Sequence, residues 1–180
     1  MKRLFLFAIF AASTFAFSLP VYSQSAEYAQ SRLDRLIQRE ILSLPFYGVF
    51  DAIGYTVDNG TVTLTGYVVR PTTSRDAERS IREVPGVTNV VNRIEVLPLS
   101  PNDDRIRQRV LRTLSNQGGS LYRYFLGANP SIRIIVNRGR VSLEGFADSR
   151  SDANRAYILA RTVPGTFGVT NNLRVLESTR

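Results

Sequence analysis

The segment that decides the fold reads VDNGTVTLTG at residues 57–66, and it returns as VNRGRVSLEG at residues 136–145. Extended outward at the same offset of 79, residues 57–97 align with residues 136–176 without a gap, and 14 of the 41 pairs are identical. The polar residues mostly differ, whereas the apolar period and the backbone-shaping residues repeat. This pattern indicates a duplicated fold and not a duplicated active site. The repeated structural motif is Gly60, Gly66, Pro85 and Gly86, followed by Gly139, Gly145, Pro164 and Gly165.

Each copy predicts the same order of elements. Asn59-Gly60 between two alternating segments predicts a type I′ hairpin, because that turn needs positive φ at both central residues. An amphipathic helix precedes each hairpin; in the second copy we expect it to begin at residues 102–104, where short acidic side chains cap it. A capping-box helix follows each hairpin, starting at residues 73–76 or 149–152, and Val-Pro-Gly ends it before a last strand. The sequence therefore predicts an α+β protein of two tandem α-β-β-α-β modules, each a small three-stranded mixed sheet with two helices on one face.

These motifs resemble a known family. The pattern G-x-V-x-L-x-G, then Val-Pro-Gly-Val about twenty residues later, then V-x-N-x-ϕ-x-V, is similar to the BON domain, the bacterial osmotic-shock and nodulation module. The resemblance implies α-β-β-α-β architecture, periplasmic residence, and association with phospholipid or other envelope components without catalysis. The second copy departs from the pattern at Thr166-Phe167 and by an apparent nine-residue insertion after its first helix. The matching residues are 60–66, 84–87 and 90–96 in the first copy and 139–145, 163–165 and 169–175 in the second.

The N-terminus predicts a secretory signal peptide over residues 1–23. Lys2-Arg3 precedes an apolar run at residues 4–17, and small residues follow a break at residues 18–20. The run is too short to cross about 30 Å of hydrocarbon, so we expect cleavage, with an uncleaved anchor as the open alternative. The two modules are predicted over residues 27–98 and 102–177.

Composition excludes much catalytic chemistry. The chain has no cysteine and no histidine. Thiolate nucleophiles, imidazole bases and Cys or His metal ligands are therefore unavailable. Two modules of about 70 residues each also lie near the lower limit for one self-sufficient core, with little room for a deep cleft. We expect no enzyme activity, no metal and no cofactor.

Charge is shared unevenly between the modules. Residues 27–98 hold 8 Arg and 9 acidic residues, a balance of −1, whereas residues 99–180 hold 13 Arg and 6 acidic residues, a balance of +7. Such a basic module suits an anionic surface. Nucleic acid is not an expected partner, because a signal peptide directs the chain to a compartment where nucleic acid is scarce.

The candidate binding residues lie in the second module. Arginines spaced i, i+4 and i+7 predict a basic strip on its first helix, and aromatic residues alternate with arginine in the insertion. The alternatives are a solvated helix face for the arginines and core or inter-module packing for the rings. The lipid- or anion-binding candidates are Arg105, Arg109, Arg112, Arg123, Tyr122, Tyr124 and Phe125.

The sequence thus predicts a non-enzymatic envelope protein. The leading hypothesis is peripheral attachment to anionic phospholipid surfaces, mainly through module 2. The alternative is a structural or interaction module that docks an envelope protein or a cell-wall polymer. The lipid, the partner and the oligomeric state stay open.

Overall fold

The computed structural model describes residues 22–116 and 119–176. The predicted signal peptide lies almost wholly outside the described residues and stays a prediction. No described helix is long and apolar enough to cross a membrane.

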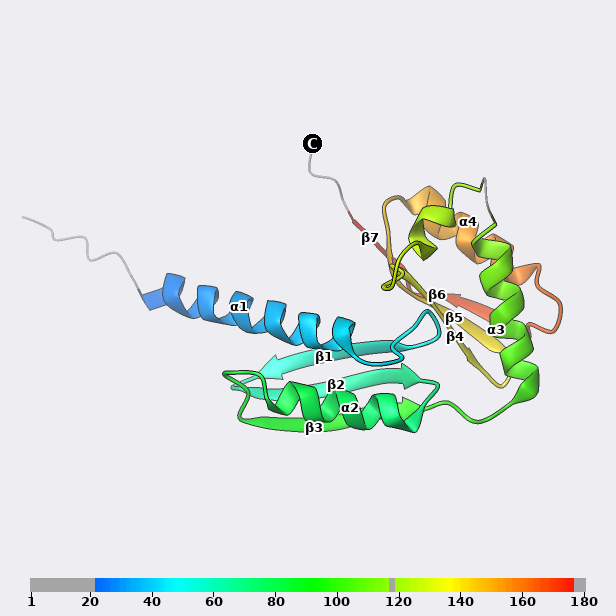
Figure 1. Ribbon diagram of the computed structural model, residues 1–180. Helices are drawn as coiled ribbons and strands as arrows, with labels where there is room; N and C mark the ends of the chain where they lie inside the picture. The colour runs from blue at the N-terminus through cyan, green and yellow to red at the C-terminus, as the bar shows by residue number, and fades with distance from the viewer. Residues whose placement is uncertain (1–21, 117–118, 177–180) are drawn as a thin grey trace, which may run out of the picture.

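Module 1 is built on a strand order of β1-β2-β3. The central strand β2 runs antiparallel to β1 and parallel to β3. The hairpin therefore supplies the antiparallel pair, and a helical crossover supplies the parallel one. Both helices cover one face of the sheet, and α1 extends past the sheet at its N-terminal end (Figure 1). The elements are α1 (Tyr22–Ser43), β1 (Ala52–Asp58), β2 (Thr61–Val68), α2 (Pro71–Arg82) and β3 (Asn89–Val96).

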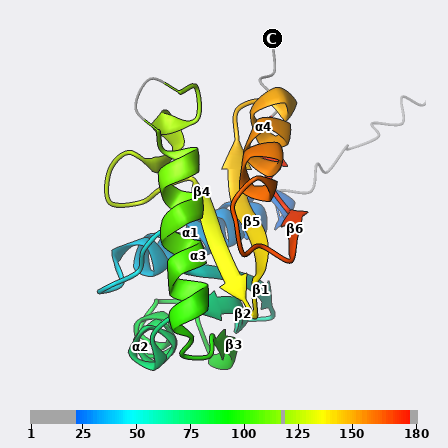
Figure 2. The ribbon, with the colours of Figure 1, turned by 90° about the vertical axis from the view of Figure 1, so that its right-hand side faces the viewer.

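Module 2 repeats this topology with one addition and one break. A 3-10 turn, η1, stands between its first helix and its hairpin, and the last strand is divided into β6 and β7, which pair with successive parts of β5. The two helices, α3 and α4, lie side by side in front of β4 and β5 (Figure 2). The predicted fold class, two α-β-β-α-β modules with mixed sheets, is confirmed. The elements are α3 (Pro101–Leu114), η1 (Tyr122–Phe125), β4 (Ile132–Asn137), β5 (Arg140–Ala147), α4 (Arg150–Arg161), β6 (Gly168–Asn171) and β7 (Arg174–Val175).

Glycines of the repeat occupy two kinds of backbone position that other residues disfavour: a turn with positive φ, and a close approach to a neighbouring backbone. Asn59 and Gly60 have φ of 47° and 77°, and the second hairpin turn matches them, so the predicted type I′ turns are present. At Gly66 and Gly145, a Cβ atom would lie 2.1 Å from a backbone oxygen of the neighbouring strand. These two positions therefore admit only glycine without a shift of the backbone.

The two modules have separate hydrophobic cores, and residues 47–50 of module 1 contact strand β4 of module 2. The backbone N–H of Ile134 donates to the carbonyl of Val49 at 2.8 Å, so module 1 covers the free edge of β4. Arg133 donates to the carbonyl of Gly48 at 2.7 Å, and its guanidinium lies 4.4 Å from the ring centre of Tyr47. Val49 and Phe50 pack against the core of module 2. Residues 47–50 of module 1 thus pack the two modules together.

Helix starts differ from expectation in two of three places. In α3 the cap is Ser100, whose Oγ accepts from the backbone N–H of Asp103 at 3.2 Å. Arg70, before α2, makes no side-chain cap, and the expected capping box is absent there. Ser149 does cap α4, accepting from the N–H of Asp152 at 3.1 Å.

The insertion in module 2 is shorter than the sequence alignment indicates. A Cβ added at Gly86 would meet Leu33 at 3.6 Å, and one added at Gly165 would meet Ile106 at 3.6 Å. Since these glycines correspond at an offset of 79, Leu33 corresponds to Ile106 at an offset of 73. The insertion is therefore six residues long and not nine. The apolar positions of the two first helices can be aligned at more than one offset, so the sequence alone did not fix the alignment. The contacts of Gly86 and Gly165 identify the offset of 73.

Candidate functional site

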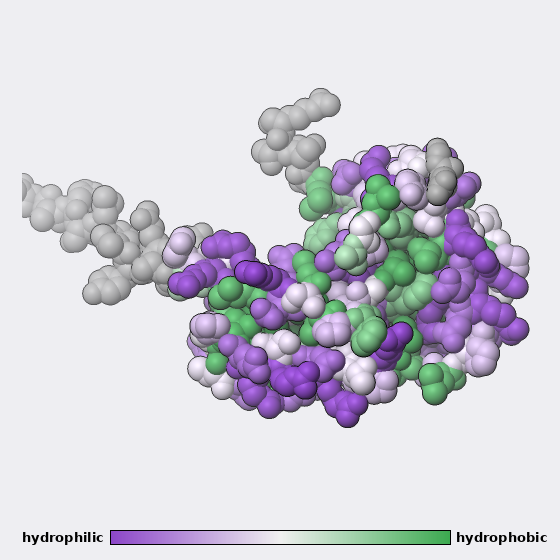
Figure 3. Space-filling model, in the orientation of Figure 1, coloured by the Kyte–Doolittle hydropathy of each residue, from purple (hydrophilic) through white to green (hydrophobic). Residues whose placement is uncertain are grey.

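The α3 strip, Arg105, Arg109 and Arg112, lies on one exposed face of its helix. The three side chains line a shallow depression of about 340 Å³ together with Asp104 and Gln108. Hydrophilic residues cover this side of the molecule (Figure 3, right). Within residues 28–116 and 119–176, no ion pair joins the strip to an acidic side chain.

The sequence of α3 turns the strip outward. Ile106, Val110 and Leu114 face the core and are buried, so residues displaced by about a third of a turn are exposed. Arg109 donates to the carbonyl of Pro164 at 3.3 Å, which places the strip beside the turn that follows α4. The strip is thus held against a second element and is not carried on an isolated helix.

Arg107 is a cation of α3 that does not lie on the exposed surface of the helix. It is only 3% exposed, donates to the carbonyl of Val136 at 2.7 Å and pairs with Asp104. The end of β4 supplies an acceptor that the helical spacing alone could not reveal. Arg107 therefore belongs to the packing of module 2 and adds little to its accessible charge.

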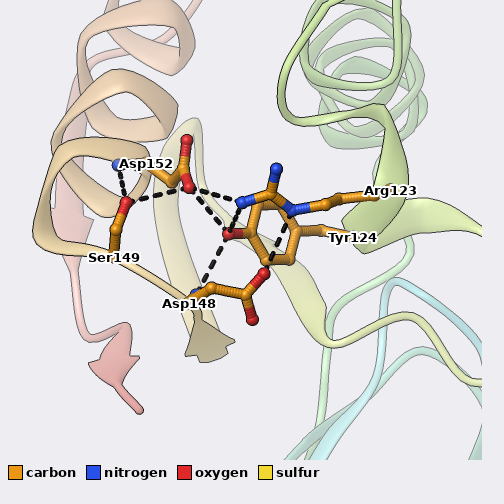
Figure 4. A network of polar contacts seen from close by, with 5 residues as sticks. All are labelled: Arg123, Tyr124, Asp148, Ser149 and Asp152. Atoms are coloured by element: carbon orange, nitrogen blue, oxygen red, sulfur yellow. Dashed lines mark hydrogen bonds and ion pairs between the residues drawn. The ribbon is translucent and has the colours of Figure 1, made fainter. Parts of the chain in front are cut away.

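The insertion forms a polar network at the other end of α4 (Figure 4). Arg123 pairs with Asp148 at 3.1 Å and with Asp152 at 2.8 Å. The hydroxyl of Tyr124 donates to Asp152 at 2.8 Å and accepts from the N–H of Asp148 at 3.0 Å. The network therefore ties η1 to the first turn of α4.

Hydrogen bonds set the charge state of this network. Partial desolvation favours the protonated form of Asp152, but hydrogen bonds from Tyr124 and Ser149 and the charge of Arg123 outweigh it. The pKa of Asp152 is consequently below its ordinary value. Burial raises the pKa of Tyr124, which stays a neutral donor near pH 7.

The predicted site residues separate into two groups. Arg109 contacts Pro164 beyond the C-terminal end of α4, whereas Arg123 binds Asp152 in the first turn. A helix of 12 residues spans about 18 Å, so the expected single surface is divided. Tyr124 is 4% exposed and belongs to the core, Phe125 packs against that core, and Tyr122 is half-buried. The binding role of the α3 strip stays a prediction.

Sequence reasoning predicted the turn between β4 and β5 as part of the fold but did not single it out as a candidate functional surface. Asp103, expected as a helix cap, is buried and accepts from the N–H groups of Arg138 and Gly139, each at 2.8 Å. The ring of Phe167 rests on this turn and is 77% exposed. The available signal was Phe167 itself, the departure from the repeat that follows Val-Pro-Gly.

A groove of about 410 Å³ lies where the outer face of the module 2 sheet meets Tyr67 of module 1. Asn172 donates to Glu144 at 2.7 Å and to Ser142 at 3.2 Å, and Ser142 donates to Glu144. The side-chain oxygen of Asn137 has no hydrogen-bond partner among the described residues. The wall of the groove is therefore polar, although the unpartnered Asn137 oxygen is itself buried. Among the described residues, no three metal-ligating side chains gather here or elsewhere.

Comparison with known proteins gives a family match and one curated relative. The BON domain model matches residues 35–98 and 102–177. Osmotically-inducible protein Y of Escherichia coli (strain K12) is 25% identical over 122 residues, which is 68% of this chain and 61% of the relative. The chain thus matches about three fifths of the length of that relative.

Two structures of one solved protein show a distant likeness to this chain. The C-terminal domain of CdsD, a structural protein of the type III secretion system of Chlamydia trachomatis, is 11% identical with a TM-score of 0.32, covering 80% of this chain and 97% of that one. A second structure of CdsD has a TM-score of 0.31 at 11% identity and covers 81% of this chain and 94% of that one.

Proposed function

The chain belongs to the BON domain family, with two copies of the domain, and from that premise we propose that it is a non-catalytic periplasmic binding protein that attaches peripherally to anionic phospholipid surfaces through module 2. The signal-like N-terminus supports the periplasmic location. The name of the osmotically inducible relative supports a role in the envelope under osmotic stress.

The α3 strip carries the proposal. Three exposed guanidinium groups on one helix face suit a plane of phosphate groups better than they suit a single small anion. Each cationic side chain near an anionic membrane is worth about 1 kcal/mol, so the strip supplies roughly 3 kcal/mol, about a hundredfold in affinity. Arg123, already paired with two carboxylates, contributes less.

Liposome co-sedimentation tests this proposal. Purified protein is mixed with vesicles of phosphatidylglycerol or phosphatidylcholine at low and high salt. We expect binding to phosphatidylglycerol, weakening with salt, and a loss of more than about a hundredfold when Arg105, Arg109 and Arg112 are all replaced by Glu, because each replacement removes a cation and adds an anion.

The chain offers a matched control for that variant. Arg32, Arg35 and Arg39 are exposed on α1, the corresponding helix of module 1. Replacing these three by Glu makes the same change of charge, and we expect a much smaller loss. Equal losses in the two triple variants would contradict the assignment to module 2, and no binding by the unaltered protein would contradict lipid attachment altogether.

The groove favours a second candidate function, docking of a cell-wall polymer. Its hydroxyl, amide and carboxylate groups offer both donors and acceptors beside the ring of Tyr67. A hydroxyl-rich chain needs that mixture, whereas a bilayer surface is too flat to enter the groove. Co-sedimentation with insoluble cell-wall polymer, in the absence of liposome binding, would favour this second function.

A further inference from the structure

The hairpin end of module 2, defined here as Arg138, Gly139, Arg140 and Phe167, has an exposed aromatic ring in a basic setting. The backbone N–H of Phe167 donates to the carbonyl of Gly139 at 2.8 Å. A Cβ added at Gly139 would lie 2.5 Å from the Phe167 ring, so the ring rests directly on the turn. Even so, 77% of Phe167 is exposed.

Module 1 has the same backbone without these side chains. There the N–H of Thr88 donates to the carbonyl of Gly60 at 2.8 Å, and a Cβ on Gly60 would lie 2.9 Å from Thr88 Oγ1. The corresponding residues of the turn are Asn59 and Thr61. Because the backbone forms with Asn, Thr and Thr, folding does not require Arg, Arg and Phe at the hairpin end of module 2. The presence of Arg, Arg and Phe in module 2, where module 1 has Asn, Thr and Thr, therefore indicates a contact with a partner outside the chain.

The hairpin end is continuous with the α3 strip. Asp103, in the first turn of α3, binds the N–H groups of Arg138 and Gly139. Arg109 donates to the carbonyl of Pro164, three residues before Phe167. In Figure 2, α3, the turn between β4 and β5 and the loop leading to β6 all lie toward the viewer. A plane that meets the strip at Arg105 and Arg109 therefore meets the hairpin end as well.

We propose that the hairpin end is the apolar anchor of module 2 on an anionic bilayer, with the Phe167 ring entering the headgroup layer between phosphates held by Arg138 and Arg140. This inference rests on the proposed function and adds the orientation of the molecule on the membrane. Aromatic rings are favoured at headgroup depth, and arginines beside them pair with the lipid phosphates. A bilayer fits better than a soluble anion, because a soluble anion gains nothing from an exposed phenyl ring.

The absence of tryptophan from the chain allows a direct test. Phe167→Trp introduces a single indole at the hairpin end, and Thr88→Trp introduces one at the equivalent place in module 1. With phosphatidylglycerol vesicles we expect a blue shift of the Phe167→Trp emission and quenching by brominated acyl chains. We expect neither for Thr88→Trp. A shift in Thr88→Trp alone, or in both variants equally, would overturn the proposed orientation.

A second variant separates the contribution of the Phe167 ring to membrane binding from the contribution of the charged side chains. Phe167→Thr restores the residue that module 1 carries, so we expect an unchanged thermal midpoint. Binding that survives 0.5 M salt should fall about tenfold, because ring burial is not screened whereas the charge attraction is. The α3 triple variant should instead lose mainly low-salt binding.

The outcomes are distinguishable. If the unaltered protein binds vesicles but Phe167→Thr binds equally well at every salt concentration, and Phe167→Trp shows no shift, the anchor is refuted and the proposed function stands. If the unaltered protein does not bind phosphatidylglycerol vesicles, both are refuted.

Discussion

Gly66 and Gly145 are the residues on which the repeat depends most directly. Each has φ near the middle of the positive range, 110° and 103°, and each faces a backbone oxygen 2.1 Å from where a Cβ would lie. We expect Gly66→Ala and Gly145→Ala each to lower the free energy of unfolding of their module by more than about 2 kcal/mol, since backbone must move in both cases. Urea unfolding followed by circular dichroism measures this.

Gly54→Ala is the control for these variants. Gly54 lies in β1, its φ is not positive, and the nearest atom to an added Cβ is Thr65 Oγ1 at 3.5 Å, an ordinary contact. We expect a change within about 0.5 kcal/mol. A cost at Gly54 equal to that at Gly66 would show that alanine is disfavoured for a reason other than backbone geometry.

Asn92 and Asn171 show how far residue-level reasoning reached. The recurrence of asparagine at one strand position is most simply explained by a local backbone hydrogen bond, and each side-chain oxygen accepts from the N–H two residues on, at 3.0 Å and 3.3 Å. Each amide nitrogen also donates to a carbonyl on the second helix of its module, Ser74 or Ala153, at 3.1 Å. The second bond crosses 18 residues and depended on packing.

At the scale of elements, the Arg123–Tyr124–Asp152 network joins η1 to α4 and makes that junction sensitive to acid. Because the pKa of Asp152 is lowered in the folded protein, its contribution to stability is complete above its ordinary pKa of 3.8 and is lost as the pH falls through the lowered value. We expect Asp152→Asn to reduce the free energy of unfolding by about 2 kcal/mol at pH 7, with the difference from the unaltered protein shrinking below pH 3.8. Urea titrations at pH 7 and pH 3 measure both effects.

Asp148→Asn is the matched control within the same network. The Asp148 side chain is largely exposed and, among the residues that the structure describes, binds only Arg123; surface pairs of this kind are worth about 0–1 kcal/mol. Its backbone N–H still reaches Tyr124 in the variant. If both variants cost the same at pH 7, the junction depends on the net charge near Arg123 and not on the buried hydrogen bonds of Asp152.

At the scale of the whole molecule, Arg133 holds the two modules in one arrangement. It is 7% exposed, and burial lowers its pKa, yet it contacts Gly48 and Tyr47 of module 1. We expect Arg133→Ala to weaken the coupling between modules by about 2–3 kcal/mol, so that calorimetry resolves two transitions and proteolysis in the segment that joins β3 to α3, residues 97–100, becomes faster. Arg93→Ala, at an exposed position of β3, should change neither measurement. Unaltered calorimetry in Arg133→Ala would place the coupling in the apolar contacts of Val49 and Phe50 instead.

The sequence by itself determined the number of modules, the order of their elements and the turn types, because these depend on local backbone geometry that glycine, proline and the apolar period encode twice. The sequence could not determine which arginine side chains are bound to other groups of the protein and which are available for contact with a ligand. Arg107, Arg123 and Arg133 take partners 29, 29 and 85 residues away, and only packing brings those partners within reach. The register of the first helix, the burial of Tyr124 and the exposure of Phe167 were settled in the same way. The tertiary structure therefore decided that the cations of the α3 strip and of the hairpin end are exposed without a carboxylate partner among the described residues, whereas Arg123 of the insertion is paired with two carboxylates.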